Sequence, residues 1–187
     1  MDQYLDGVTA STTVPAIFPA MKDLVKGRAF IDGGVSRSYD IPSAMDYCLK
    51  KVGGDESKIT LDVIMLGNGA FREDDADQYK TIPMIMRYFE IRDYYGSMDL
   101  LIRAREAYKK VNWRYVLTPT EKLSSGRIPL FFEPEEMEKN IQIGMRDAKT
   151  AIAMGEGKSA QYLVDYSIQR IQGQTEITYG DFLVANF

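Results

Sequence analysis

The sequence contains no histidine among its 187 residues and a single cysteine, Cys48. A Ser-His-Asp or Cys-His catalytic arrangement within the chain is therefore excluded. Zinc held by histidine or by several thiolates is excluded as well, and no internal disulfide can form. A hydrolase built on this chain must use a base other than imidazole, and a carboxylate is the first candidate.

Long apolar runs and basic tracts are also missing. No apolar stretch approaches the roughly 18 residues of a membrane span, and the first residues, MDQYLDG, lack the basic-then-apolar order of a secretory signal. The net charge is −4 without a basic cluster, which argues against a nucleic-acid partner. With the single cysteine, these absences predict a cytoplasmic protein, with peripheral contact to membranes left open.

The composition that is present is typical of one globular α/β domain. Apolar residues make up 45% of the chain and charged residues 27%, which is enough for a sizeable core. The apolar run at 58–66 predicts a buried strand of a parallel or mixed sheet. Further strands are predicted at 28–31, 113–117, 128–132 and 176–184.

Apolar residues at helical spacing predict the remaining elements. The expected helices cover 4–13, 44–52, 134–154 and 159–171, with two more inside 79–111 divided at Gly96. Ser43 is the expected N-cap of the 44–52 helix, and Gly53-Gly54 its left-handed end. The expected apolar faces comprise Leu5 and Val8; Met45, Cys48 and Leu49; Met137, Ile141, Met145, Ala148 and Ile152; and Leu163, Val164, Ile168 and Ile171.

Two further segments attract attention. The acidic run at 72–77 is expected to be a solvated loop or helix start, since nothing fixes the spacing that a calcium loop needs. The stretch with Met84, Met86, Tyr88, Phe89, Tyr94 and Tyr95 admits two interpretations. It packs in the core, or it lines a groove for acyl chains, because flexible thioethers adapt to varied apolar ligands.

The strongest candidate for chemistry is Asp32-Gly33-Gly34. A carboxylate follows the predicted strand 28–31, and two glycines come after it. Asp-Gly is also a common turn dipeptide that only reverses the chain. A base must lie within hydrogen-bond reach of the hydroxyl that it activates. Gly33 and Gly34 are expected to let the backbone turn sharply and leave the carboxylate open to a cleft.

The residues around this turn resemble the patatin-like phospholipase family. The run A-S-T-T-V-P-A-I-F-P at 10–19, followed by F-I-D-G-G-V, is similar to that family's A-S-x-A-x-P-x-x-F-P stretch and its strand ending in D-G-G or D-G-A. The strand running into Gly67-Asn68-Gly69 resembles the family's S-L-G-T-G strand, and 128–152 its last strand and helix. The resemblance covers 3–153 and is most specific in 1–70.

The resemblance implies a three-layer α/β/α hydrolase domain with a mostly parallel sheet, of which this chain forms the C-terminal half. Residues 1–153 would belong to that domain, and 154–187 would add a helix and a possible strand that pack on it. In the family a serine attacks an ester and an aspartate accepts its proton without histidine. Asp32 matches that aspartate, with Gly33 and Gly34 beside the substrate. No metal or organic cofactor is required.

The chain departs from the family pattern in two ways. It contains no G-x-S-x-G nucleophile elbow and no glycine-rich oxyanion loop, and Ser11, Ser36, Ser38 and Ser97 lack the required glycines. In the family both features precede the A-S-x-A stretch, so we expect a complementary polypeptide that carries them. The spacing from Asp32 to Pro42 is also longer than in the family, and the family's asparagine has no clean match.

The function expected from these residues is part of a lipid acyl hydrolase that acts on phospholipid or another acyl ester. Without neighbouring strands, the 61–66 strand would expose an unpaired edge, which also predicts a second polypeptide. The missing nucleophile keeps a different class open, a non-catalytic binding or scaffold protein on a degenerate patatin-like fold. An unrelated α/β binding domain with chance matches is the third interpretation.

Overall fold

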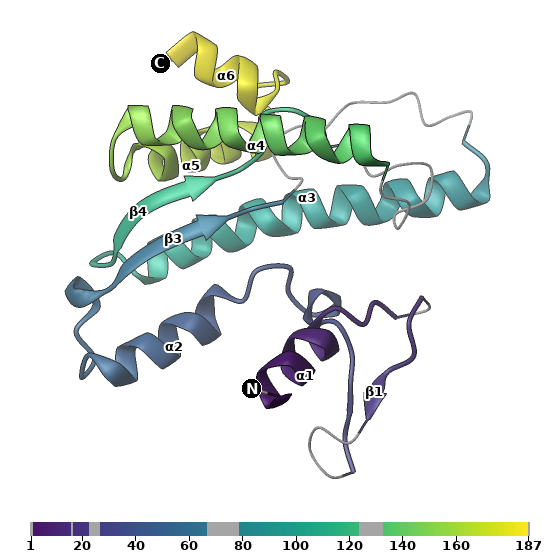
Figure 1. Ribbon diagram of the computed structural model, residues 1–187. Helices are drawn as coiled ribbons and strands as arrows, with labels where there is room; N and C mark the ends of the chain where they lie inside the picture. The colour runs from purple at the N-terminus through teal and green to yellow at the C-terminus, as the bar shows by residue number, and fades with distance from the viewer. Residues whose placement is uncertain (1, 16, 23–26, 67–78, 124–132, 187) are drawn as a thin grey trace. The chain divides into compact units, whose positions relative to one another are not determined.

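A computed structural model describes residues 2–15, 17–22, 27–66, 79–123 and 133–186 (Figure 1). The chain divides into two compact units, Met1–Asp40 and Ile41–Phe187. Helices and short strands occur together, so the mixed α/β class is confirmed. None of the described helices is both long and apolar enough to cross a bilayer.

The first unit combines one helix with a short antiparallel ribbon. Helix α1 (Asp2–Ser11) precedes β1 (Met21–Lys22) and β2 (Ala29–Phe30), which pair antiparallel, and the 3₁₀ turn η1 (Gly33–Val35) follows. The predicted helix at 4–13 and strand at 28–31 thus form with shifted bounds. The expected packing of Leu5 and Val8 is wrong, because these side chains are 55% and 46% exposed, whereas Ala10 is buried.

A pair of parallel strands organises the second unit. Strand β3 (Thr60–Ile64) lies beside β4 (Asn112–Leu117), with Thr60 opposite Asn112 and Ile64 opposite Leu117. The prediction of parallel pairing is confirmed for this two-stranded sheet. Parallel strands require a long crossover connection, and the 27-residue helix α3 (Thr81–Ala107) lies within it.

The other helices of this unit begin and end near the predicted signals. They are α2 (Ile41–Lys51), η2 (Glu56–Lys58), α4 (Pro134–Met154), α5 (Lys158–Ile171) and α6 (Tyr179–Asn186). Gly53 and Gly54 follow α2 at φ 66° and 84°, which confirms the left-handed end. Pro134 opens α4, where its missing N–H costs nothing. Helix α5 contacts β4, α3, α4 and α6 (Figure 1).

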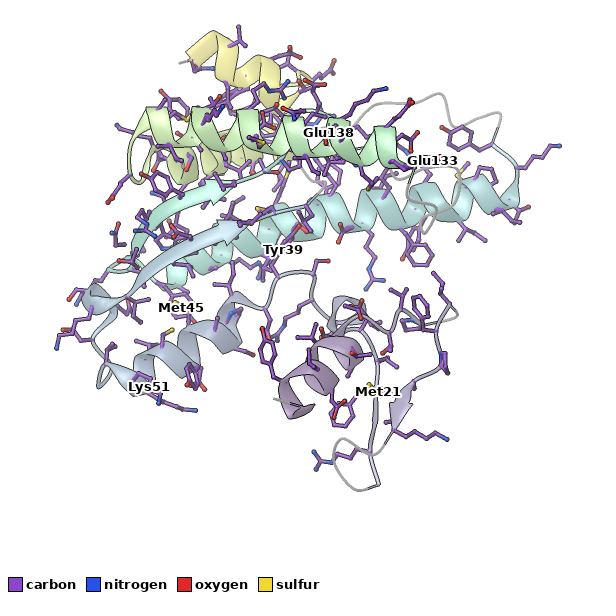
Figure 2. All side chains as sticks on the ribbon, viewed as in Figure 1. Met21, Tyr39, Met45, Lys51, Glu133 and Glu138 are labelled. Carbon is purple, nitrogen blue, oxygen red and sulfur yellow. The ribbon has the colours of Figure 1, made fainter. Side chains whose placement is uncertain are left out.

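The core of the second unit is formed by buried side chains from helices and strands. Met45 of α2, labelled in Figure 2, is 1% exposed, and Leu101 and Val116 are 2% exposed. The hydroxyls of Tyr94 and Tyr166 lie 3.0 Å apart, and Tyr166 also donates to the carbonyl of Ile177. Burial raises the pKa of Tyr94, so this buried phenol is neutral and its polar end is satisfied.

Three predictions about elements are wrong. Helix α3 runs through Gly96 without a break, because burial of its other residues outweighs the ~1 kcal/mol cost of one glycine. Ser43 lies inside α2, which begins at Ile41. The predicted strand at 176–184 is helix α6 instead. Thr178 Oγ1 accepts from the N–H of Asp181 and donates to its carboxylate, which starts that helix.

Two apolar faces expected to pack are exposed in the described structure. Ile141, Met145 and Ile152 of α4 are between 50% and 58% exposed. The end of α5 behaves likewise, since Ile168 and Ile171 are 36% and 48% exposed while Leu163 and Val164 are buried as expected. Expectations for 67–69, 72–77 and 128–132 lie outside the described residues.

The outer edge of β4 is closed by the start of α5. The buried hydroxyl of Ser159 accepts a hydrogen bond from the backbone N–H of Val116 at 3.0 Å. The N–H of Gly157 donates to the carbonyl of Arg114 at 2.8 Å. A helix start thus satisfies edge groups that an additional strand would otherwise pair.

Replacing Ser159 by alanine is expected to destabilise the protein, because the buried N–H of Val116 would lose its acceptor. The free energy of unfolding should fall by about 1–3 kcal/mol, measured by urea denaturation. The control is Ser57→Ala, since the hydroxyl of Ser57 donates to Asp55 at the surface. This substitution should lower the free energy of unfolding by less than about 0.5 kcal/mol. Equal effects of the two substitutions would contradict this role of Ser159.

Candidate active site

Asp32 follows β2 and begins the turn η1. Its Oδ1 accepts a hydrogen bond from the backbone N–H of Gly34 at 2.7 Å. The side chain is half-buried, and Oδ2 accepts no hydrogen bond from the described residues. One carboxylate oxygen is therefore held by the backbone while the other is free to take a proton.

Two of the motifs singled out in the sequence are joined at this turn. The backbone N–H of Asp32 donates to the carbonyl of Thr13 at 3.0 Å. The hydroxyl of Thr13 lies 2.7 Å from the carbonyl of Ala10 and 3.5 Å from that of Phe30. The A-S-T-T segment and the D-G-G turn are thus neighbours in the first unit, although a long stretch of chain separates them.

Gly33 and Gly34 have a different role in the turn after Asp32 from the one that the sequence predicts. The backbone turns at Gly33–Val35 as expected, but neither Gly33 nor Gly34 adopts a positive φ, so the turn does not use the left-handed conformation that glycine permits. A Cβ at position 34 would meet Asp32 Oδ1 at 3.0 Å, whereas one at 33 would meet nothing within 4 Å. Glycine at 34 therefore leaves room for the Asp32 carboxylate, which a side chain there would displace by a few tenths of an ångström.

None of the serines considered in the sequence stands at a nucleophile elbow, which requires a sharp strand-to-helix turn. Ser11 ends α1 and donates to the carbonyl of Val8. Ser97 is buried inside α3, and Ser36 directly follows η1. The first unit therefore presents a candidate base without an elbow serine among its described residues.

A second polar cluster, around Asp147 of α4, had no signal in the sequence. Asp147 is 8% exposed and accepts from both the N–H and the hydroxyl of Thr120 at 2.9 Å. A cavity of ≈ 20 Å³ lies beside it, lined also by Thr118, Ser159 and Tyr179. That volume holds about one water, which would satisfy the otherwise unpartnered hydroxyl of Thr118. The cluster clamps α4 to the end of β4 and is too small for a substrate.

Other possible sites are not supported by grouped side chains. In 2–15, 17–22, 27–66, 79–123 and 133–186, no three Asp, Glu or Cys residues gather as a metal ligand set. Met84, Tyr88 and Phe89 are between 42% and 58% exposed, whereas Tyr94 is 3% exposed. Core packing therefore holds for Tyr94, and the acyl-groove interpretation of the other three stays a hypothesis.

In comparisons with known proteins, no family model, curated protein or solved structure matches the chain. The resemblance to patatin-like phospholipases therefore rests on the quoted motifs alone.

Alanine substitutions at the two glycines should differ. Gly34→Ala is expected to displace the Asp32 carboxylate and break its hydrogen bond to the residue 34 amide, because the new Cβ meets Oδ1. Gly33→Ala should leave that bond intact. Amide hydrogen exchange at residue 34, followed by NMR, should accelerate only in Gly34→Ala. Faster exchange in both variants, or in neither, would contradict this account of the turn.

Proposed function

We propose that this chain is part of a lipid acyl hydrolase, a phospholipase or esterase, in which Asp32 is the general base. The nucleophilic serine would come from a polypeptide outside the printed sequence. The observation that carries the proposal is the Thr13–Asp32 hydrogen bond, which joins the two motifs of the resemblance beside a carboxylate with one open oxygen. This arrangement supports a proton acceptor that works without histidine.

The proposed reaction proceeds in two steps. Asp32 Oδ2 takes the proton from the serine hydroxyl as the serine oxygen bonds to the ester carbonyl carbon. The alcohol leaves with that proton, and an acyl-serine remains. Asp32 then takes a proton from water, whose oxygen attacks the acyl-serine, and returns it to the serine as the free fatty acid departs. Throughout, the N–H of Gly34 holds Oδ1, so that Oδ2 keeps one orientation.

Two features support a separate polypeptide as the source of the serine. The sequence contains no G-x-S-x-G. Within the second unit, Ile64 and Leu66 beside β3 and Ile141 and Ile152 on α4 are all more than half exposed. Exposed apolar side chains that form a contiguous patch are typical of a face that binds another protein, and Ile64 and Leu66 lie two residues apart in the chain at the end of β3.

The second candidate function is a non-catalytic binding or scaffold protein, and one observation favours it. Asp55 begins η2 in the same way as Asp32 begins η1, since its Oδ1 accepts from the N–H of Ser57 at 3.1 Å. Asp55 belongs to no catalytic motif. A carboxylate in this position can therefore be a structural cap and nothing else.

Asp32→Asn is expected to lower ester hydrolysis by about 10²–10⁴-fold, because the amide keeps the acceptor for Gly34 but takes no proton from serine. The rate is measured on p-nitrophenyl esters and phosphatidylcholine vesicles, with the chain assembled with its G-x-S-x-G polypeptide. Asp55→Asn is the matched control, as it changes the same kind of cap in the other unit, and it should leave the rate unchanged.

A fluorophosphonate probe separates the two candidates further. It should label the serine of the G-x-S-x-G polypeptide and leave this chain unlabelled. Hydrolysis by Asp32→Asn at the wild-type rate would remove Asp32 from the mechanism and favour the scaffold function.

A further inference from the structure

The two edges of the parallel sheet in the second unit differ. The outer edge of β4 is closed by Ser159 and Gly157 at the start of α5, and Figure 1 shows β4 between β3 and α5. Within the described residues, β4 is the only strand that pairs with β3. Among the described residues of the second unit, no strand therefore pairs with the far edge of β3, which is called the open edge below.

The hydrogen bonds to β4 indicate which backbone groups lie at the open edge. The carbonyl of Ile59 accepts from Asn112, and the N–H of Met65 donates to Leu117. Since successive residues of a strand direct their N–H and carbonyl groups to opposite sides, those of Thr60, Asp62 and Ile64 face away from β4. This edge offers N–H donors and carbonyl acceptors at these alternate residues.

The side chains along this edge do not discourage pairing. Protein edges are usually guarded by lysine, proline or an unpaired charge. The stretch T-L-D-V-I-M-L at 60–66 contains neither lysine nor proline. Its one charge, Asp62, accepts a hydrogen bond from the guanidinium of Arg114 on β4. Beyond it, Ile64 and Leu66 are 65% and 70% exposed.

We propose that the open edge of β3 binds an extended strand of a second polypeptide, which continues the sheet with apolar side chains beside Ile64 and Leu66. Another extended backbone complements these N–H and carbonyl groups, as in strand addition. Lipid does not, because acyl chains leave such backbone groups unsatisfied. Parallel sheets also occur almost only where they are covered and extended by further elements.

The occupant is the polypeptide that carries G-x-S-x-G, and in this identity the inference rests on the proposed function. Its docking strand should alternate apolar and other residues so that one side contacts Ile64 and Leu66. The edge itself, with its backbone groups and exposed apolar pair, is a property of the described residues of this chain.

NMR hydrogen exchange of the full chain, alone and with that polypeptide, tests the docking site. The amides of Asp62 and Ile64 should exchange at least about tenfold more slowly in the complex. The amide of Val116 serves as an internal control, because its hydrogen bond to Ser159 is present in both states.

Ile64→Pro is the matched variant. Its N–H faces the open edge, so proline removes no bond to β4 and is tolerated at a strand edge, while its ring blocks an incoming strand. Binding should weaken about tenfold or more, whereas Ile64→Ala should weaken it less. Circular dichroism checks that Ile64→Pro folds, and Ile64→Lys replaces it if it does not, since a lysine at an edge also discourages pairing.

The outcomes separate this inference from the proposed function. Wild-type binding by Ile64→Pro or Ile64→Lys, or no slowing at Asp62 and Ile64, overturns edge docking even if Asp32-dependent hydrolysis persists. Binding through the edge without Asp32-dependent hydrolysis supports docking and rejects the hydrolase. Pairing of β3 with a second copy of the chain in place of that polypeptide also overturns docking.

Discussion

The parallel pairing of β3 with β4 is the constraint on which the second unit depends. Two parallel strands must be joined by a long crossover, and α3 supplies most of its ordered length. Leu101 on α3 and Val116 on β4 are buried in the core that results. The start of α5 then closes the outer edge of β4, where the Ser159 hydroxyl accepts from the N–H of Val116 and the N–H of Gly157 donates to the carbonyl of Arg114.

The same requirement, that backbone groups of a strand find partners, explains both edges of the sheet. At β4 a serine and a glycine at a helix start meet it. At β3 no described element does, and Ile64 and Leu66 are exposed at the same place. A single strand from a second polypeptide would both pair with the backbone groups of β3 and cover Ile64 and Leu66.

Asp32 shows how one side chain can combine a structural role with a chemical one. A carboxylate has two oxygens, and here the N–H of Gly34 occupies only Oδ1. Asp55 has the same cap geometry, but its hydroxyl neighbour Ser57 also binds Oδ1. The hydrogen bond from the Asp32 backbone to Thr13 distinguishes the two turns further, because it attaches the turn to a distant motif. Geometry alone makes Asp32 a candidate base, and catalysis depends on what lies opposite Oδ2.

Much of the second unit could be predicted from local signals. The runs predicted as strands at 58–66 and 113–117 formed strands at 60–64 and 112–117, Gly53-Gly54 ended α2, and Pro134 opened α4. Gly96 and the 176–184 segment were misjudged, because local propensity there was outweighed by burial along α3 and by the Thr178 cap of α6. Helix propensities differ by only about 1 kcal/mol per residue, so burial or one capping hydrogen bond is enough to outweigh them.

By itself, the sequence determined which chemistry is impossible and where the two strands of the parallel sheet and several helix ends lie. The absence of histidine and the succession of apolar and glycine residues are properties of neighbouring positions. Only the tertiary structure decided that the N–H of Asp32 donates to Thr13 and that Ser159 accepts from the edge of β4. It also decided that Ile141, Met145 and Ile152 of α4 are exposed. Each of these contacts joins residues that are far apart in the sequence. Local sequence patterns do not determine which such residues the fold brings together.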